Sequence, residues 1–167
     1  MNIHSLLGEF MHIPDGYLSP STVVVSYTVM VPLWVYGFRK LKESLNERTI
    51  PLLGSLSALS FLVMMFNIPV PGGTSGHAIG TALLSILFGP WTAFIAVSFV
   101  LLIQALIFGD GGISTWAVNA FDMAFIASFS GYFVFNVLKD KTRFAPFIAG
   151  WAAISFAALS DAVVLGI

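Results

Sequence analysis

The sequence predicts an all-α, polytopic bundle of transmembrane helices, with about six spans and an inserted N-terminal segment. Apolar residues make up 57% of the 167 residues and charged residues only 9%, whereas about a quarter of a typical soluble domain is charged. The mean hydropathy is +0.93. The apolar runs are continuous and show no period of two, which argues against a membrane β-barrel. The net charge of −1 argues against nucleic-acid binding, which needs a basic surface.

Six apolar runs follow one another along the chain, which we treat as one domain over residues 1–167. They cover approximately residues 21–38, 50–66, 77–88, 91–108, 114–138 and 144–167. Five runs match a hydrocarbon core of about 30 Å, but the run from residue 77 would span only about 18 Å as a helix. A loop rich in proline and glycine, residues 67–76, precedes this short run and cannot form a regular helix.

The basic residues predict the orientation in the membrane. All seven Lys and Arg lie in two loops, which the positive-inside rule places in the cytoplasm. These loops cover residues 39–48 and 139–143. Because an even number of spans must separate them, the short run must also cross the bilayer. Residues 1–20, the 67–76 loop with His77, and the 109–112 turn then all face the outside of the plasma (inner) membrane.

Histidine is the scarce side chain that could bind a metal. The chain has no cysteine, and its three histidines are His4, His12 and His77. His12 precedes a Pro-Asp-Gly turn and could be an ordinary interface residue. His77 follows irregular backbone, which at membrane depth is tolerated only inside protein or along a cavity, although it could also be a capping residue. If the two external imidazoles meet, they would suit nickel, copper, zinc or cobalt.

Three further polar residues lie near the predicted outer ends of spans. Asn119 and Asp122 are three residues apart and therefore share one helix face. They could form a hydrogen bond to the His77 ring that fixes its tautomer, or they could form an ordinary contact between helices. We expect Asp110 to be a turn residue between its neighbouring glycines.

Four motifs in order resemble the CbiM/NikM family, the substrate-binding (S) components of energy-coupling factor importers for cobalt and nickel. The motifs are Met11-His-Ile-Pro-Asp-Gly-Tyr-Leu18, Pro71-Gly-Gly-Thr-Ser-Gly-His77, Leu87-Phe-Gly-Pro-Trp91, and Gln104-Ala-Leu-Ile-Phe-Gly-Asp-Gly-Gly112 followed by Asn119. The resemblance covers roughly residues 11–167. It implies a metal-capture subunit and not an enzyme, with Ni²⁺ or Co²⁺ as the transported substrate and no organic cofactor.

The resemblance also implies a ligand set and partners. The metal would be held by the terminal amine of Met11, the amide and imidazole nitrogens of His12, and His77, with Asn119 nearby. Transport would depend on a cytoplasmic ATPase pair, a transmembrane coupling subunit and a small accessory membrane subunit. The sequence departs from the pattern in two ways. Residues 1–10 form an extension before Met11, and Asp122 stands where we expect asparagine. Family members usually also continue for one more C-terminal helix.

Two alternatives belong to other functional classes. Gly73-Thr-Ser-Gly76 matches the Gly-x-Ser-Gly motif that rhomboid-like intramembrane serine proteases carry at a helix start. Such a serine needs a histidine base from another segment, and only His12 could serve. The other alternative is a structural subunit of a membrane complex, which a failure to bind metal would favour.

Overall fold

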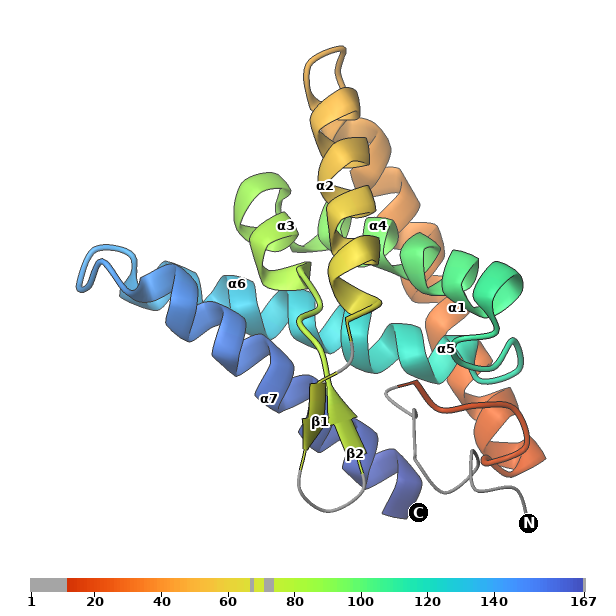
Figure 1. The fold of residues 1–167 in the computed structure, drawn as a ribbon. Helices are drawn as coiled ribbons and strands as arrows, with labels where there is room; N and C mark the ends of the chain where they lie inside the picture. The colour runs from red at the N-terminus through yellow and green to blue at the C-terminus, as the bar shows by residue number, and fades with distance from the viewer. Residues whose placement is uncertain (1–11, 67, 71–73, 167) are drawn as a thin grey trace.

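The computed structural model describes residues 12–66, 68–70 and 74–166, and most of them are helical (Figure 1). The helices are α1 (Pro20–Ser44), α2 (Thr49–Met64), α3 (Thr81–Phe88), α4 (Pro90–Ile103), α5 (Trp116–Asn119), α6 (Ala127–Leu138) and α7 (Ala145–Gly166). Two π-helical segments extend them, η2 (Gln104–Phe108) after α4 and η3 (Ala120–Ile126) between α5 and α6. The predicted transmembrane helix bundle is confirmed.

Four helical stretches among the described residues are long and apolar enough to cross a membrane. They are Pro20–Ser44, Pro90–Phe108, Trp116–Leu138 and Ala145–Gly166. The apolar helix α2 is shorter, with 16 residues. Helix α3 has only 8 residues, so it rises about 12 Å. The crossing expected at this short run therefore stays a prediction.

The loop before α3 contains a regular element that the sequence analysis did not predict. Strand β1 (Ile68–Val70) pairs antiparallel with β2 (Thr74–Gly76), and Ile68 lies opposite Gly76. Three residues per strand are too few to show an alternating pattern, and the prolines and glycines around them favour a loop. The hairpin carries the chain from the end of α2 to His77.

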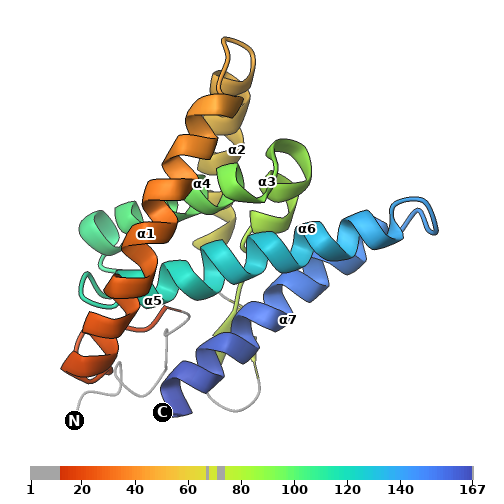
Figure 2. The ribbon, with the colours of Figure 1, turned by 180° about the vertical axis from the view of Figure 1, so that it is seen from behind.

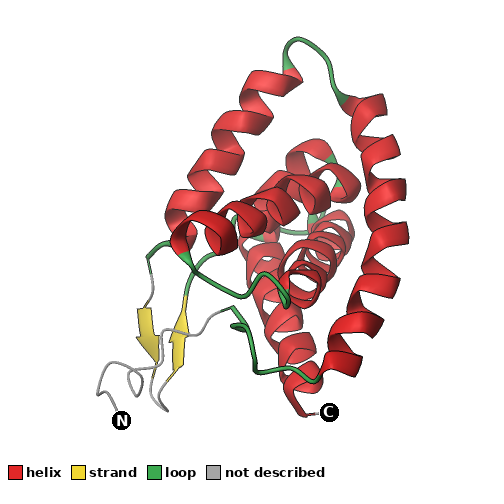
Figure 3. Ribbon diagram, turned by 90° about the vertical axis from the view of Figure 1, so that its right-hand side faces the viewer, coloured by secondary structure: helices red, strands yellow, loops and turns green. Residues whose placement is uncertain are grey.

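The helices form two pairs around a central helix. In Figure 3, α1 and α2 diverge from the turn that joins them, with the central helices between them. Helices α6 and α7 form a second antiparallel pair, and both views of Figures 1 and 2 show it diverging from the first. Helix α4 lies in the middle, where Phe94, Ile95 and Val97 are almost completely buried. This arrangement makes α4 the core of the bundle.

The chain segment before α1, the β-hairpin and the end of α7 lie at the same end of the molecule (Figures 1 and 2). Ser19 starts α1 by accepting a hydrogen bond from the backbone N–H of Thr22 at 3.2 Å, and Pro20 follows in the first turn. This combination is a common helix start. It therefore fixes the point at which residues 12–19 lead into α1.

Candidate metal centre

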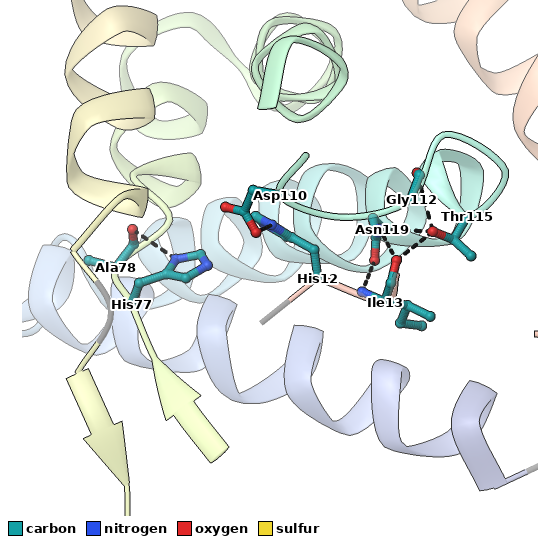
Figure 4. Close-up of polar contacts among 8 residues, drawn as sticks. All are labelled: His12, Ile13, His77, Ala78, Asp110, Gly112, Thr115 and Asn119. Carbon is teal, nitrogen blue, oxygen red and sulfur yellow. Dashed lines mark hydrogen bonds and ion pairs between the residues drawn. The ribbon is translucent and has the colours of Figure 1, made fainter. Parts of the chain in front are cut away.

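The backbone of Ile13 is held by residues that follow η2. Its N–H donates to Oδ1 of Asn119 at 2.9 Å. Its carbonyl oxygen accepts from the Gly112 N–H at 3.0 Å, from Thr115 Oγ1 at 2.5 Å and from Asn119 Nδ2 at 3.1 Å. Figure 4 shows Ile13 beside Gly112, Thr115 and Asn119, which lie before α5 and at its end. We call this set of hydrogen bonds to Ile13 the backbone clamp.

Asp15 adds a second attachment two residues further on. Its carboxylate accepts hydrogen bonds from the Ile113 N–H at 3.1 Å, the Ser114 N–H at 2.8 Å and the Ser114 hydroxyl at 2.5 Å. The side-chain and backbone hydrogen bonds from Ser114 hold the pKa of Asp15 below its usual value. These bonds stabilise the ionised form and fix the turn before α1.

The 109–112 turn needs its glycines because the N-terminal segment packs directly against it. Gly111 has a φ of +87°, and a Cβ there would lie 2.9 Å from Cβ of His12. A Cβ on Gly112 would collide with Asp15 and Thr115. Glycine permits both the left-handed backbone and this close approach. Packing against His12 and Asp15 therefore explains the last two glycines of the Gly-Asp-Gly-Gly motif.

His12 lies in a buried position and contacts Asp110. Its side chain is 2% exposed, and its Nδ1 lies 2.9 Å from Oδ1 of Asp110. Burial raises the pKa of Asp110, but the hydrogen bond with His12 and the electrostatics of the two histidines outweigh burial and leave the pKa of Asp110 below its usual value. The expectation that Asp110 is only a turn residue was wrong, because its carboxylate faces the imidazole. A hint was available, since Asp110 lies in a turn that we placed on the same side as both histidines.

His77 comes directly after β2 and lies beside His12. The two ring centroids are 5.3 Å apart, and the ring planes are tilted by 57°; Figure 4 shows the His77 ring directed toward His12. The only hydrogen bond of the His77 ring among the described residues is a long one, from Nδ1 to the Ala78 carbonyl at 3.4 Å. Burial and the neighbouring His12 lower the pKa of His77 to about 4. His77 is therefore neutral at physiological pH, as a metal ligand must be.

Both histidines present a buried nitrogen without a partner. Nε2 of His12 and Nε2 of His77 have no hydrogen bond in the described part of the chain. Within that part, no group of three or more His, Cys, Asp or Glu side chains is arranged to hold a metal ion. The two imidazoles are thus at most part of a donor set. Met11 and His4 lie outside the described residues.

Among the described residues, Asn119 and Asp122 form hydrogen bonds with partners other than His77. Asn119 binds the backbone of Ile13, next to His12, as described above. Asp122 is 1% exposed, and its carboxylate accepts a hydrogen bond from Ser160 on α7. Two roles were considered for this pair, support of His77 and a contact between helices. For Asp122, the structure shows the contact between helices. Asn119 takes a role that was not foreseen, because its partner is a backbone group.

Comparisons with known proteins decide the family. A family model described as "Cobalt uptake substrate-specific transmembrane region" matches residues 12–167. The chain belongs to this family. The fused nickel transport protein NikMN of Rhodobacter capsulatus is 42% identical over 164 residues, which are 94% of this chain and 47% of that protein. The cobalt transport protein CbiM of Acetoanaerobium sticklandii is 37% identical over 148 residues, 86% of this chain and 61% of that protein.

A solved structure supports the same assignment. The crystal structure of a truncated transition metal transporter is 45% identical, covers 93% of this chain and 74% of its own chain, and superposes with a TM-score of 0.87. The predicted resemblance to the CbiM/NikM family is confirmed, and the chain is a multi-pass membrane protein. The chain spans about half the length of several of its relatives.

The family also bears on the enzyme alternative. The relatives are named as metal transport proteins, which supports a transporter component rather than a rhomboid-like protease. The geometry agrees, because Ser75 lies in strand β2 and not at a helix start. The proposed serine motif therefore lacks the structural context that it requires.

Proposed function

We propose that this protein is the substrate-binding subunit of an importer for nickel or cobalt, and that His12 and His77 bind the ion. The observation that carries the proposal is the pair of buried imidazoles whose Nε2 atoms have no partner within the described ranges. A buried polar group without a partner costs about 1–3 kcal/mol, and here two such groups lie together. One metal ion between them would satisfy both.

The separation of the rings supports a shared ion. With a metal–nitrogen bond of about 2 Å, two imidazoles on one ion keep their ring centroids about 4.5 to 6.5 Å apart. The observed separation of 5.3 Å lies in that range. The chain has no cysteine, so no thiolate competes, and imidazole nitrogen suits nickel and cobalt. Relatives named for cobalt and for nickel support Ni²⁺ or Co²⁺ as the transported substrate.

The remaining donors come from the N-terminal side in this proposal. Met11 directly precedes His12, and its amine becomes a donor when the chain begins at Met11. The family match covers residues 12–167, and the proposal treats residues 1–10 as an extension. A chain that begins at Met11 should then bind Ni²⁺ at least about tenfold more tightly than the 167-residue chain, a difference of about 1.4 kcal/mol.

The energy for transport comes from partner subunits. The chain carries no Gly-Lys-Ser/Thr phosphate-binding motif, the signature of P-loop ATPases. We assign ATP hydrolysis to a cytoplasmic ATPase pair that acts through a transmembrane coupling subunit, together with a small accessory membrane subunit. Relatives with fused chains, such as NikMN, support a partner that is itself a membrane component. This arrangement is that of an energy-coupling factor importer.

The decisive experiment measures Ni²⁺ and Co²⁺ affinity of the purified full chain in detergent by calorimetry. His77→Ala should weaken binding at least about 100-fold, because it removes one imidazole of a small donor set. His4→Ala is the matched control and should bind like the original chain. Each variant is accepted only if its circular dichroism shows an intact helical bundle. Unchanged affinity in His77→Ala would remove the site and favour a structural subunit.

The site faces the outside of the plasma membrane in this proposal, because the basic loops lie at the cytoplasmic side. Single cysteines at Ser44 and at Thr142 test the orientation in the cysteine-free chain. Both should react with a membrane-impermeant maleimide only from the cytoplasmic side. External labelling at either position would contradict the orientation and the count of crossings.

A further inference from the structure

An apolar groove lies between α1 and α2, and its lining includes neither of the two buried histidines. Both helices pack against α4 and diverge from each other (Figure 3), so α4 forms the floor of the groove. Its volume is about 710 Å³, and its lining side chains are apolar except for Ser57. A large apolar surface of this kind marks a place where lipid or another protein binds.

The groove is about as long as one leaflet of a bilayer is deep. Along α2 its lining extends from Ile50 to Phe61, a stretch that rises about 16 Å as a helix. One leaflet of a hydrocarbon core is about 15 Å deep. The rings of Phe61 and Phe108, with centroids 5.2 Å apart, close the end of the groove that lies away from the turn between α1 and α2. This length fits one acyl chain better than a helix that crosses the whole bilayer.

The other end of the groove opens beside the turn between α1 and α2. In Figure 1 this turn lies at the end of the molecule opposite the β-hairpin. Leu41 and Leu45 of α1 line the groove, and Lys42 lies within one helical turn of both. Arg48 directly precedes α2, and it stands two residues before Ile50 of the lining. The open end of the groove therefore carries two basic side chains.

These two basic residues are not neutralised by acidic neighbours. Lys40 pairs with Glu43 at 2.8 Å. Lys42 and Arg48 are exposed, and neither forms an ion pair among the residues that the structure describes. Two such cations at the mouth of an apolar groove complement a molecule that has an anionic head and an apolar tail.

We propose that this groove binds an anionic phospholipid, such as phosphatidylglycerol, with its phosphate at Lys42 and Arg48 and one acyl chain along α2. Basic residues next to transmembrane helices attract anionic headgroups, and their methylene stems cover apolar surface at the same time. The site is separate from the metal centre in its residues and in its ligand. The bound lipid bridges α1 and α2, which both rest on α4 but diverge from each other.

Gly54 allows the groove to be filled without disturbing α2. It lines the groove, and a Cβ at this position would meet no atom within 4 Å. Leucine is a better helix former than glycine, so Gly54→Leu should keep the fold and occupy the space of the acyl chain. Ala58→Leu, one helical turn further along the same lining, is a second variant of this kind. Both separate binding in the groove from a general attraction of lipid to the basic loop.

Native mass spectrometry tests the proposal on the purified full chain in detergent. The chain is titrated with phosphatidylglycerol or with phosphatidylcholine that carries the same acyl chains. One phosphatidylglycerol molecule should bind at least about tenfold more tightly than phosphatidylcholine. Lys42→Gln combined with Arg48→Gln should abolish this preference. Lys139→Gln combined with Lys141→Gln, which removes the same charge from the 139–143 loop, is the matched control and should keep it.

The two groove variants complete the test. Gly54→Leu and Ala58→Leu should each weaken phosphatidylglycerol binding at least about tenfold, with the helix content by circular dichroism unchanged. Equal affinity of the original chain for the two lipids would overturn the proposal and leave the groove for a helix of a partner subunit. An unchanged preference after the loss of Lys42 and Arg48 would overturn it as well. Undiminished binding in both groove variants would place the lipid outside the groove, against the proposal.

Discussion

His12 and the three residues after it are neighbours in the sequence, but they differ in how far their polar groups are hydrogen-bonded. Both backbone groups of Ile13 are hydrogen-bonded in the backbone clamp, and Asp15 accepts three hydrogen bonds from Ile113 and Ser114. His12 is also buried, yet its Nε2 has no hydrogen-bond partner among the residues that the structure describes. A buried imidazole nitrogen without a partner among the described residues therefore lies directly beside a segment held by several hydrogen bonds.

This contrast shows how a binding group can remain unsatisfied without losing its place. An unpartnered imidazole gains by turning toward any available donor or acceptor, so its position must be fixed by other bonds. The clamp fixes the backbone on one side, and Asp110 fixes the ring through Nδ1.

The largest expected effect is the acid sensitivity that His77 gives to the metal-free protein. Its pKa is lowered from 6.5 to about 4 by burial and by His12. Below pH 6.5 the unfolded chain therefore binds a proton that the folded chain refuses, so stability falls until about pH 4, by about 3 kcal/mol at most. Thermal unfolding at pH 7 and at about pH 4.5 should show this loss.

The control is His77→Gln, which does not titrate in this range. It should lose clearly less stability than the original chain over the same pH interval. Parallel losses in the two proteins would show that His77 titrates normally and that its ring is open to water.

A smaller effect should follow from breaking the backbone clamp. Asn119→Ala removes both hydrogen bonds between the Asn119 side chain and the backbone of Ile13 and leaves buried backbone groups with fewer partners. We expect a loss of about 2 kcal/mol in the free energy of unfolding and a fall of more than tenfold in Ni²⁺ affinity. Thermal unfolding and calorimetry measure the two effects.

Asn136 on α6 provides the matched asparagine, because its Nδ2 donates to the Tyr132 carbonyl within the same helix. Asn136→Ala should leave Ni²⁺ affinity unchanged. If Asn119→Ala lost stability but kept its affinity, the clamp would serve folding alone and would not position His12.

The smallest effect is expected at Asp15, whose side chain is exposed. Its hydrogen bonds from Ser114 and Ile113 are open to solvent, so Asp15→Ala should lower the free energy of unfolding by less than about 1 kcal/mol. The pKa of Asp15 is lowered, so its contribution is present above the usual carboxyl pKa of 3.8 and is lost at lower pH. The pH range in which Asp15 affects stability lies below the range for His77. Thermal unfolding of Asp15→Ala and of His77→Gln, measured against pH, should therefore separate the two contributions.

The sequence predicted the fold well and the site in part. Continuous apolar runs and clustered basic residues predicted the helical spans, because both signals are local. The sequence also placed His12 and His77 on one side, and the structure brings their rings together. Their role as metal ligands stays a prediction, and so does that of Met11.

The contacts that hold the site could not be predicted, for physical reasons. Asp110 stands between two glycines, a pattern typical of any turn, and its partner lies 98 residues away. Asn119 binds the backbone of Ile13, and a backbone group carries no sequence signal. The π-helical segments η2 and η3 also lack a recognisable pattern. Each of these features depends on which segments meet in three dimensions.

The stacked tryptophans Trp34 and Trp116 give the site a built-in optical reporter. Their ring centroids are 4.1 Å apart and their planes are tilted by only 15°, so their electronic transitions couple and give a near-ultraviolet circular dichroism signal that depends on their mutual angle. Trp116 directly follows Thr115, which binds the Ile13 carbonyl. Any movement of the N-terminal segment would therefore be transmitted to one ring of the pair and become visible without any attached label.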